Sequence, residues 1–180
     1  MTLQLTDDLR AILISTAQLL DATRTRYATI GGVAVQLHLR TPRPTDNLDV
    51  AVESYADIPR SPLRAAGFVY GRRNAHSDAW LAPRVASGHP KINVRFVAGT
   101  PELAAAISDA TTVAVNGYDL KVATPEDLIA LALAAAEDPY RKPAKRRRDV
   151  SDAIQLLEQH PAGALPALRA RLARLVQQLP

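Results

Sequence analysis

Two neighbouring glycines, Gly31 and Gly32, form the first site in the sequence that could bind a ligand or take part in a reaction. Gly31 and Gly32 follow a short apolar, β-prone run, Tyr27–Ile30, and precede a stretch, Val33–Leu39, that favours a helix. A glycine turn at the start of a helix leaves backbone amides open to an anion, and the helix N-terminus favours negative charge. The pattern therefore predicts either a phosphate-binding turn or a tight turn with a purely structural role.

A polar pair follows on the next predicted strand, Asn47–Val52. Asn47 and Asp49 alternate with Leu48 and Val50, and side chains two residues apart on a strand point to the same face. Polar side chains beside a glycine turn suit phosphoryl chemistry, in which divalent ions hold a triphosphate and activate the attacking hydroxyl. Such ions prefer hard oxygen ligands, carboxylates above all.

These residues resemble a known family. The runs 31–38 and 43–50 look like the Gly-Gly turn and the Arg-x-Thr-x-Asp-hydrophobic-Asp motif of the minimal nucleotidyltransferases of bacterial abortive-infection and toxin–antitoxin systems. The runs 122–131 and 148–152 add to the resemblance, which covers most of residues 27–158. It implies a polymerase-β-like fold, an NTP substrate, Mg²⁺ as cofactor if the chain is active, and an RNA or protein acceptor, with a cognate antitoxin protein as a possible partner.

The resemblance also assigns residues to the site, and two of them depart from the family pattern. Gly31, Gly32, Arg43 and Thr45 correspond to nucleotide-binding positions. The three metal-binding aspartates correspond to Asn47, Asp49 and Asn93, so that Asp49 alone keeps its charge and would bind metal together with Asn47. An amide oxygen can bind a cation but offers no charge to offset the dehydration of Mg²⁺.

Two further positions bear on activity. The family usually has a lysine close to the position of Ile129, and this chain has Leu131-Ala132-Leu133 there. Asp46 could restore a second carboxylate if a β-bulge turned it toward Asp49; otherwise it is a loop residue that caps a turn. Two functions stay open: an active nucleotidyltransferase, or a catalytically degenerate protein of the same fold that binds a nucleotide, RNA or another protein.

A basic cluster lies farther along the chain. Its members are Lys145, Arg146, Arg147 and Arg148, preceded by Arg141 and Lys142. Cations near the start of a helix are slightly unfavourable, which suggests an anionic partner such as a triphosphate or RNA; a solvated basic face is the alternative. A DNA-binding role for the arginine-rich C-terminal helix is a third and weaker interpretation.

The elements that must position these residues alternate between strands and helices. Besides those already named, we expect helices over about 5–24, 58–66, 101–106, 124–136, 146–158 and 165–179, and strands over 68–70, 91–97, 112–115 and 118–122. Asn116-Gly117 predicts a hairpin and hence a mixed sheet. We expect an α+β nucleotidyltransferase fold over residues 1–123, with a helical part, 124–180, packed on it; residues 74–90 could not be assigned.

Composition sets the remaining bounds. The chain has 180 residues, 47% of them hydrophobic, a net charge of +4 and no cysteine. The absence of cysteine excludes disulfides and thiolate metal sites. The sequence shows no secretory signal and no apolar run of the roughly 20 residues that span a bilayer. We therefore expect a cytoplasmic globular protein without membrane partners.

Overall fold

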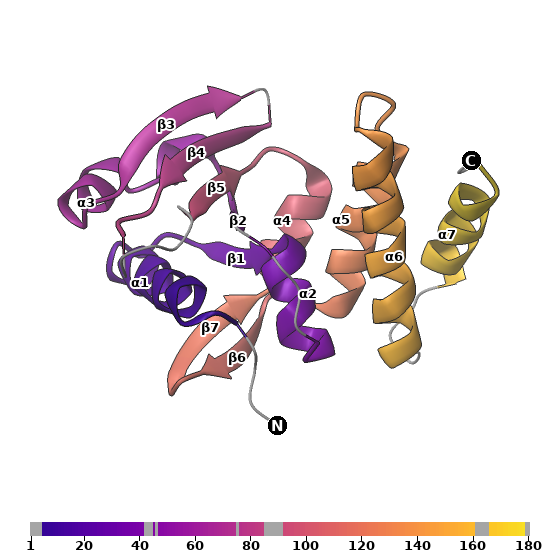
Figure 1. The fold of residues 1–180 in the computed structure, drawn as a ribbon, viewed down its shortest axis with the longest axis horizontal. Coiled ribbons are helices and arrows are strands. Elements are labelled where there is room, and N and C mark those ends of the chain that lie inside the picture. Colours follow the sequence, from indigo (N-terminus) through magenta and orange to yellow (C-terminus); the bar gives the residue numbers. More distant parts are fainter. Residues whose placement is uncertain are drawn as a thin grey trace. The chain divides into compact units, whose positions relative to one another are not determined.

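A computed structural model describes residues 5–41, 45, 47–74, 76–84, 92–160 and 166–178. The chain divides into two compact units, Met1–Ala123 and Thr124–Pro180. Indigo to pink elements in Figure 1 belong mostly to the first unit, and the orange and yellow helices belong to the second.

Unit 1 is built on a mixed seven-stranded sheet with the strand order β3-β4-β5-β2-β1-β7-β6. β2 runs antiparallel to β1 and parallel to β5, while β1 runs parallel to β7. This arrangement confirms the predicted α+β class with a mixed sheet. In chain order the elements are α1 (Asp7–Ala22), β1 (Tyr27–Ile30), α2 (Gly31–Leu39), β2 (Asn47–Val52), a 3-10 turn (Tyr55–Asp57), α3 (Arg60–Ala65), β3 (Val69–Asn74), β4 (Ser77–Leu81), β5 (Asn93–Val97), α4 (Pro101–Ser108), β6 (Thr111–Val115) and β7 (Tyr118–Val122).

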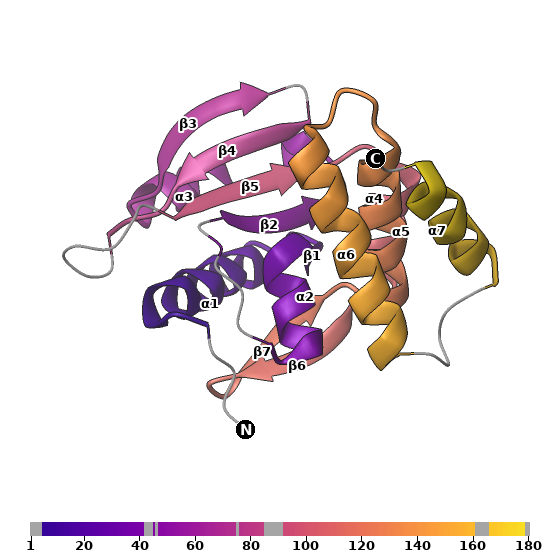
Figure 2. The same cartoon turned by 45° about the vertical axis from the view of Figure 1, so that its right-hand side comes forward.

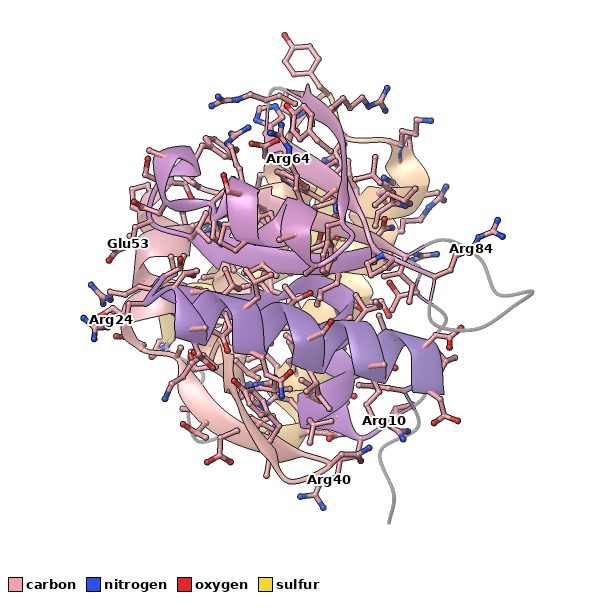
Figure 3. All side chains as sticks on the ribbon, turned by 90° about the vertical axis from the view of Figure 1, so that its left-hand side faces the viewer. Arg10, Arg24, Arg40, Glu53, Arg64 and Arg84 are labelled. Carbon is pink, nitrogen blue, oxygen red and sulfur yellow. The ribbon has the colours of Figure 1, made fainter. Side chains whose placement is uncertain are left out.

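A large part of the core of unit 1 lies on one face of this sheet. Five side chains that point to that face are almost completely buried: Leu48, Val50 and Val52 of β2, and Val94 and Phe96 of β5, which are in register with Leu48 and Val50. Helix α1, which Figure 3 shows in front of the sheet between the labelled Arg10 and Arg24, buries an apolar stripe at helical spacing. That stripe consists of Leu9, Ile12, Leu13, Ala17 and Leu20. The other sheet face carries the intervening residues of β2 and β5.

Strand β4 is the main element that the sequence did not predict. Ser77–Leu81 pairs antiparallel with β3 on one side and with β5 on the other. Asp78 and Trp80 point into the core and are fully buried. Arg60 of α3 donates a hydrogen bond of 2.6 Å to the Asp78 carboxylate, so that the buried charge is paired. Aspartate is depleted in strands, which is why this segment gave no strand signal.

The hairpin between β6 and β7 confirms the Asn-Gly prediction. Asn116 and Gly117 have φ angles of 49° and 78°. Positive φ at both central residues is the geometry of a type I′ turn, whose twist matches that of the flanking strands. The hairpin places β7 beside β1, where Thr29 pairs with Val122.

Unit 2 contains three helices: α5 (Pro125–Glu137), α6 (Pro143–Gln159) and α7 (Pro166–Gln178). Thr124 caps α5 by accepting a hydrogen bond of 3.2 Å from the Asp127 amide. Helix α6 begins at Pro143 rather than at Arg146, because proline suits the first turn of a helix. Figure 2 shows α5 and α6 running side by side, joined by a short turn. Among the described residues, no helix is long and apolar enough to cross a membrane.

Candidate functional site

The register between β2 and β5 brings four polar side chains to one face of the sheet. The two strands are parallel neighbours, with Asn47 opposite Asn93 and Asp49 opposite Arg95. Residues in register on neighbouring strands share a face, as do residues two apart on one strand. Asp49 and Asn93 therefore lie on the same face, and Asn93 is in register with the residue two positions before Asp49.

Asp49 is held by an arginine that the sequence reasoning did not include in the site. Arg95 Nε donates to Asp49 Oδ1 at 2.6 Å, and Arg95 Nη2 donates to Oδ2 at 2.7 Å. The side chains are 36% and 17% exposed, respectively. A bidentate, partly desolvated pair of this kind is among the stronger polar contacts in proteins. The signal was present: the alternation that places Asn93 on the site face also places Arg95 there.

Gly31 lets the Asp49 carboxylate approach the start of α2. A Cβ atom on Gly31 would lie 2.7 Å from Asp49 Oδ2, and the residue has a φ of +65°. Both features require glycine. Ile30, the N-cap residue of α2, provides no side-chain hydrogen bond to the helix. The first amides of α2 therefore begin next to Asp49 without a side-chain cap.

Thr45 fixes the chain as it enters β2. Its Oγ1 donates to the Asn47 carbonyl at 3.1 Å and accepts from the Asn47 amide at 3.3 Å. A Cβ atom on Gly32 would lie 3.9 Å from the same oxygen. The structure thus brings Gly31, Gly32, Thr45, Asn47 and Asp49 together around the N-terminus of α2. Arg43 and Asp46, the other two candidates in this run, lie outside the described residues.

These side chains do not form a good Mg²⁺ site. Asp49 is the single carboxylate among Asn47, Asp49 and Asn93, so a Mg²⁺ ion here would depend on the two oxygens of Asp49. Both of its oxygens accept from Arg95. Within the described part of the chain, no group of three or more histidine, aspartate or glutamate side chains could hold a metal ion. A guanidinium is the cation that this carboxylate binds.

The basic cluster on unit 2 divides into two groups. Arg146 Nε donates to the Ala136 carbonyl at 2.6 Å and so satisfies the C-terminal end of α5. Arg141 forms a bidentate pair with Asp149. Both of these arginines have structural contacts. The side chains of Lys142, Lys145, Arg147 and Arg148 are exposed.

The fold corresponds to that of one class of solved structures. Solved structures with a similar fold are nucleotidyltransferases and nucleotidyltransferase-like proteins, which supports the fold expected from the Gly31-Gly32 and Asp49 motif. No protein-family model matches the chain, and no curated protein matches it either.

Three structures illustrate the similarity. An antigenic nucleotidyltransferase-like protein from Paracoccidioides brasiliensis is 20% identical, with a TM-score of 0.66 over 96% of this chain and 89% of that one. The antibiotic-resistance factor ANT(2'')-Ia, in complex with adenylyl-2''-tobramycin, is 13% identical, with a TM-score of 0.57 over 94% and 96% of the two chains. The lincosamide antibiotic adenylyltransferase LnuA, bound to lincomycin, is 10% identical, with a TM-score of 0.53 over 81% and 96%. At these identities the likeness establishes the fold.

Proposed function

We propose that this chain is a catalytically degenerate protein of the nucleotidyltransferase fold that binds a nucleoside triphosphate without metal-dependent nucleotidyl transfer. The observation that carries the proposal is the bidentate contact between Arg95 and Asp49. It occupies both oxygens of the carboxylate that the family resemblance assigns to the metal.

The charge balance of the site supports this proposal. Three family aspartates would contribute a charge of about −3, whereas Asn47, Asp49 and Asn93 contribute −1. Arg95 then brings the sum for these four side chains to zero. A neutral site lacks the electrostatic attraction that offsets the dehydration of a small divalent cation.

The same site suits a phosphate group better than it suits a metal. Helix α2 begins at Gly31 without a side-chain cap. The backbone amides at an uncapped helix N-terminus favour an anion. Gly32 and the Thr45 hydroxyl lie beside that helix start, and Arg43 is the further residue that the resemblance assigns to the nucleotide. The family resemblance also predicts a second partner, either RNA or a cognate antitoxin protein, and this stays a prediction.

Calorimetric titration with each of the four NTPs, in Mg²⁺ and in EDTA, tests the proposal. We expect the NTP affinities in the two buffers to agree within about threefold, because the proposed site binds the phosphates without a metal. A threefold change in affinity corresponds to less than about 1 kcal/mol. We also expect no transfer of labelled nucleotide to total tRNA. Metal-dependent transfer that Asp49→Ala abolishes would overturn the proposal.

A variant that restores the missing acids provides the matched comparison. Asn47→Asp/Asn93→Asp/Arg95→Gln should gain Mg²⁺ affinity by tenfold or more, because three carboxylates then share one face without the guanidinium. Gln18→Glu/Gln155→Glu adds two carboxylates at exposed helix positions and should leave Mg²⁺ binding unchanged. An equal gain in both variants would mean that the site does not resemble a metal centre.

Active nucleotidyl transfer is the second candidate, and the fold shared with the antibiotic-resistance factor ANT(2'')-Ia and the lincosamide antibiotic adenylyltransferase LnuA favours it. Their bound molecules, adenylyl-2''-tobramycin and lincomycin, point to a small hydroxyl-bearing acceptor as an alternative to RNA or protein. For this chain the candidate requires Arg95 to release Asp49 during turnover. The transfer assay above, repeated with aminoglycoside and lincosamide acceptors, distinguishes the two candidates.

A further inference from the structure

The turn between α5 and α6 combines exposed cations with an exposed aromatic ring. Lys142, Lys145 and Arg148 follow one another at three-residue spacing, so that they form a row along the first turns of α6. We call these three residues the basic row. Arg147 is also exposed but lies off this row. Within the part of the chain that the structure describes, none of the three forms an ion pair.

The position of the basic row has an electrostatic cost. α6 is a helix of 17 residues whose first turn contains no acidic residue, and its N-cap, Lys142, makes no side-chain cap hydrogen bond. The positive end of the helix dipole disfavours cations in the first turn, where Lys142 and Lys145 lie. Arg141 and Arg146 offset this through contacts with Asp149 and the Ala136 carbonyl. The basic row has no such contact, so an external anion would relieve the repulsion.

Tyr140 lies directly before the row and is 95% exposed. Its backbone is fixed by Asp138, whose carboxylate accepts from the Tyr140 amide at 2.9 Å and whose carbonyl accepts from the Arg141 amide at 3.1 Å. The turn therefore presents the ring to solvent on a hydrogen-bonded backbone. Val69 and Val176 are the other large apolar side chains described as exposed, and neither belongs to this turn. An isolated ring lacks the apolar area that a protein or a membrane would bury.

We propose that this turn and the basic row bind single-stranded RNA, with an unpaired base stacked on Tyr140 and neighbouring phosphates on Lys142, Lys145 and Arg148. Base stacking on an aromatic side chain and phosphate contacts with cations are the two components of single-strand recognition. The row extends about 9 Å along the helix axis, at about 1.5 Å per residue, which suits a short stretch of backbone. A duplex keeps its bases stacked and would offer phosphates alone. The proposal concerns unit 2 and does not depend on the state of Asp49.

Fluorescence anisotropy with the full chain and a short labelled RNA without secondary structure tests this inference. Lys145→Ala/Arg148→Ala should weaken binding at least tenfold at about 100 mM salt and reduce the slope of log K against log salt by about 1.4, since each phosphate contact contributes about 0.7. Tyr140→Ala should weaken binding about tenfold with an unchanged salt slope, while Tyr140→Phe keeps the affinity within about twofold because the stacking ring remains.

Matched controls separate this surface from general charge. Arg64→Ala/Arg84→Ala removes two exposed cations from unit 1, at the positions labelled in Figure 3, and should leave RNA binding unchanged. Duplex RNA of the same sequence should bind more weakly and should not respond to Tyr140→Ala. Single-stranded DNA that binds more tightly than RNA, anionic vesicles that compete fully, or an equal loss in the control variant would overturn the inference. NTP affinity measured on the same variants should not change, which keeps this test distinct from that of the Asp49 site.

Discussion

Arginine and a divalent metal are alternative partners for the same carboxylate, and in this chain the arginine has the contact. The Arg95 guanidinium matches both Asp49 oxygens in one plane, which a hydrated Mg²⁺ does not do. The two asparagines, Asn47 and Asn93, face each other across β2 and β5 without adding charge. The residues of the site therefore fit the proposed binding of phosphate through backbone amides and cations.

Gly31 should be much less tolerant of substitution than Gly32. Gly31→Ala places a Cβ atom 2.7 Å from Asp49 Oδ2 in a residue with φ of +65°, so Asp49 must move away from Arg95. Backbone strain of about 1–2 kcal/mol and the weakened ion pair should together lower the free energy of unfolding by roughly 2–3 kcal/mol. Urea denaturation measures this change.

Gly32→Ala is the matched control. Its Cβ atom would be 3.9 Å from the nearest side-chain atom, Thr45 Oγ1, and Gly32 lies within α2. Alanine should keep or raise the free energy of unfolding, by up to about 1 kcal/mol, because it restricts the unfolded chain. Equal losses in the two variants would show that Asp49 does not pack against Gly31 as described.

The helices divide into two groups by the way they begin. α1, α4 and α5 each start at a threonine whose hydroxyl accepts from a backbone amide, namely Thr6, Thr100 and Thr124. α2, α3 and α6 start at Ile30, Pro59 and Lys142 without such a bond. The starts of α2 and α6 lie at the two places where we propose anionic ligands, whereas α3 begins without a cap and is given no ligand. In the capped helices, the threonine hydroxyl satisfies a backbone amide of the first turn and so stabilises the helix.

The cap of α5 is open to a direct test. Thr124→Ala removes the hydrogen bond to the Asp127 amide and should lower the free energy of unfolding by about 1 kcal/mol. Thr124→Ser keeps the hydroxyl and should cost less than about 0.5 kcal/mol. Chemical denaturation of both variants measures the difference. Equal losses would assign the effect to the threonine methyl group instead of the hydrogen bond.

At the scale of the whole molecule, both units bury apolar side chains, and unit 2 also contains an ion pair between α5 and α7. The sheet of unit 1 buries large side chains from β2, β5 and α1. In unit 2, Leu175 is the buried apolar residue of α7 within the described side chains, and Arg171 binds Glu137 of α5 through two hydrogen bonds. Attachment of α7 therefore combines the buried Leu175 with a partly exposed ion pair.

This ion pair predicts a pH dependence. The hydrogen bond from Arg171 lowers the pKa of the Glu137 carboxyl below its ordinary value. The pair therefore stabilises the folded chain above the unfolded pKa, about 4.3, and this contribution is lost as the pH falls through the lower folded value. Because Glu137 is 41% exposed, the effect should stay below about 1 kcal/mol.

Glu137→Gln isolates that contribution from those of other carboxyl groups. The free energy of unfolding of the native chain should exceed that of the variant near neutral pH, and the difference should shrink below about pH 4. Urea denaturation across the pH range measures it. A difference that stays constant with pH would show that Glu137 acts by packing alone.

Local features of the fold could be predicted from the sequence because they depend on neighbouring residues. Examples are the Asn116-Gly117 hairpin, the Thr124 cap and the alternation that puts Asn47 and Asp49 on one face. The glycine turn before α2 belongs to the same group. Each follows from backbone geometry over a few residues.

The partner of Asp49 was decided by tertiary structure. β2 and β5 are far apart in sequence, and their register depends on how the apolar residues between Leu48 and Phe96 fill the core face of the sheet. A shift by one residue would turn every side chain of a strand to the other face, and a shift by two would place Asn93 opposite Asp49. Only the packed sheet selects the register in which Arg95 lies beside Asp49, and that register determines whether the carboxylate meets a guanidinium or a metal.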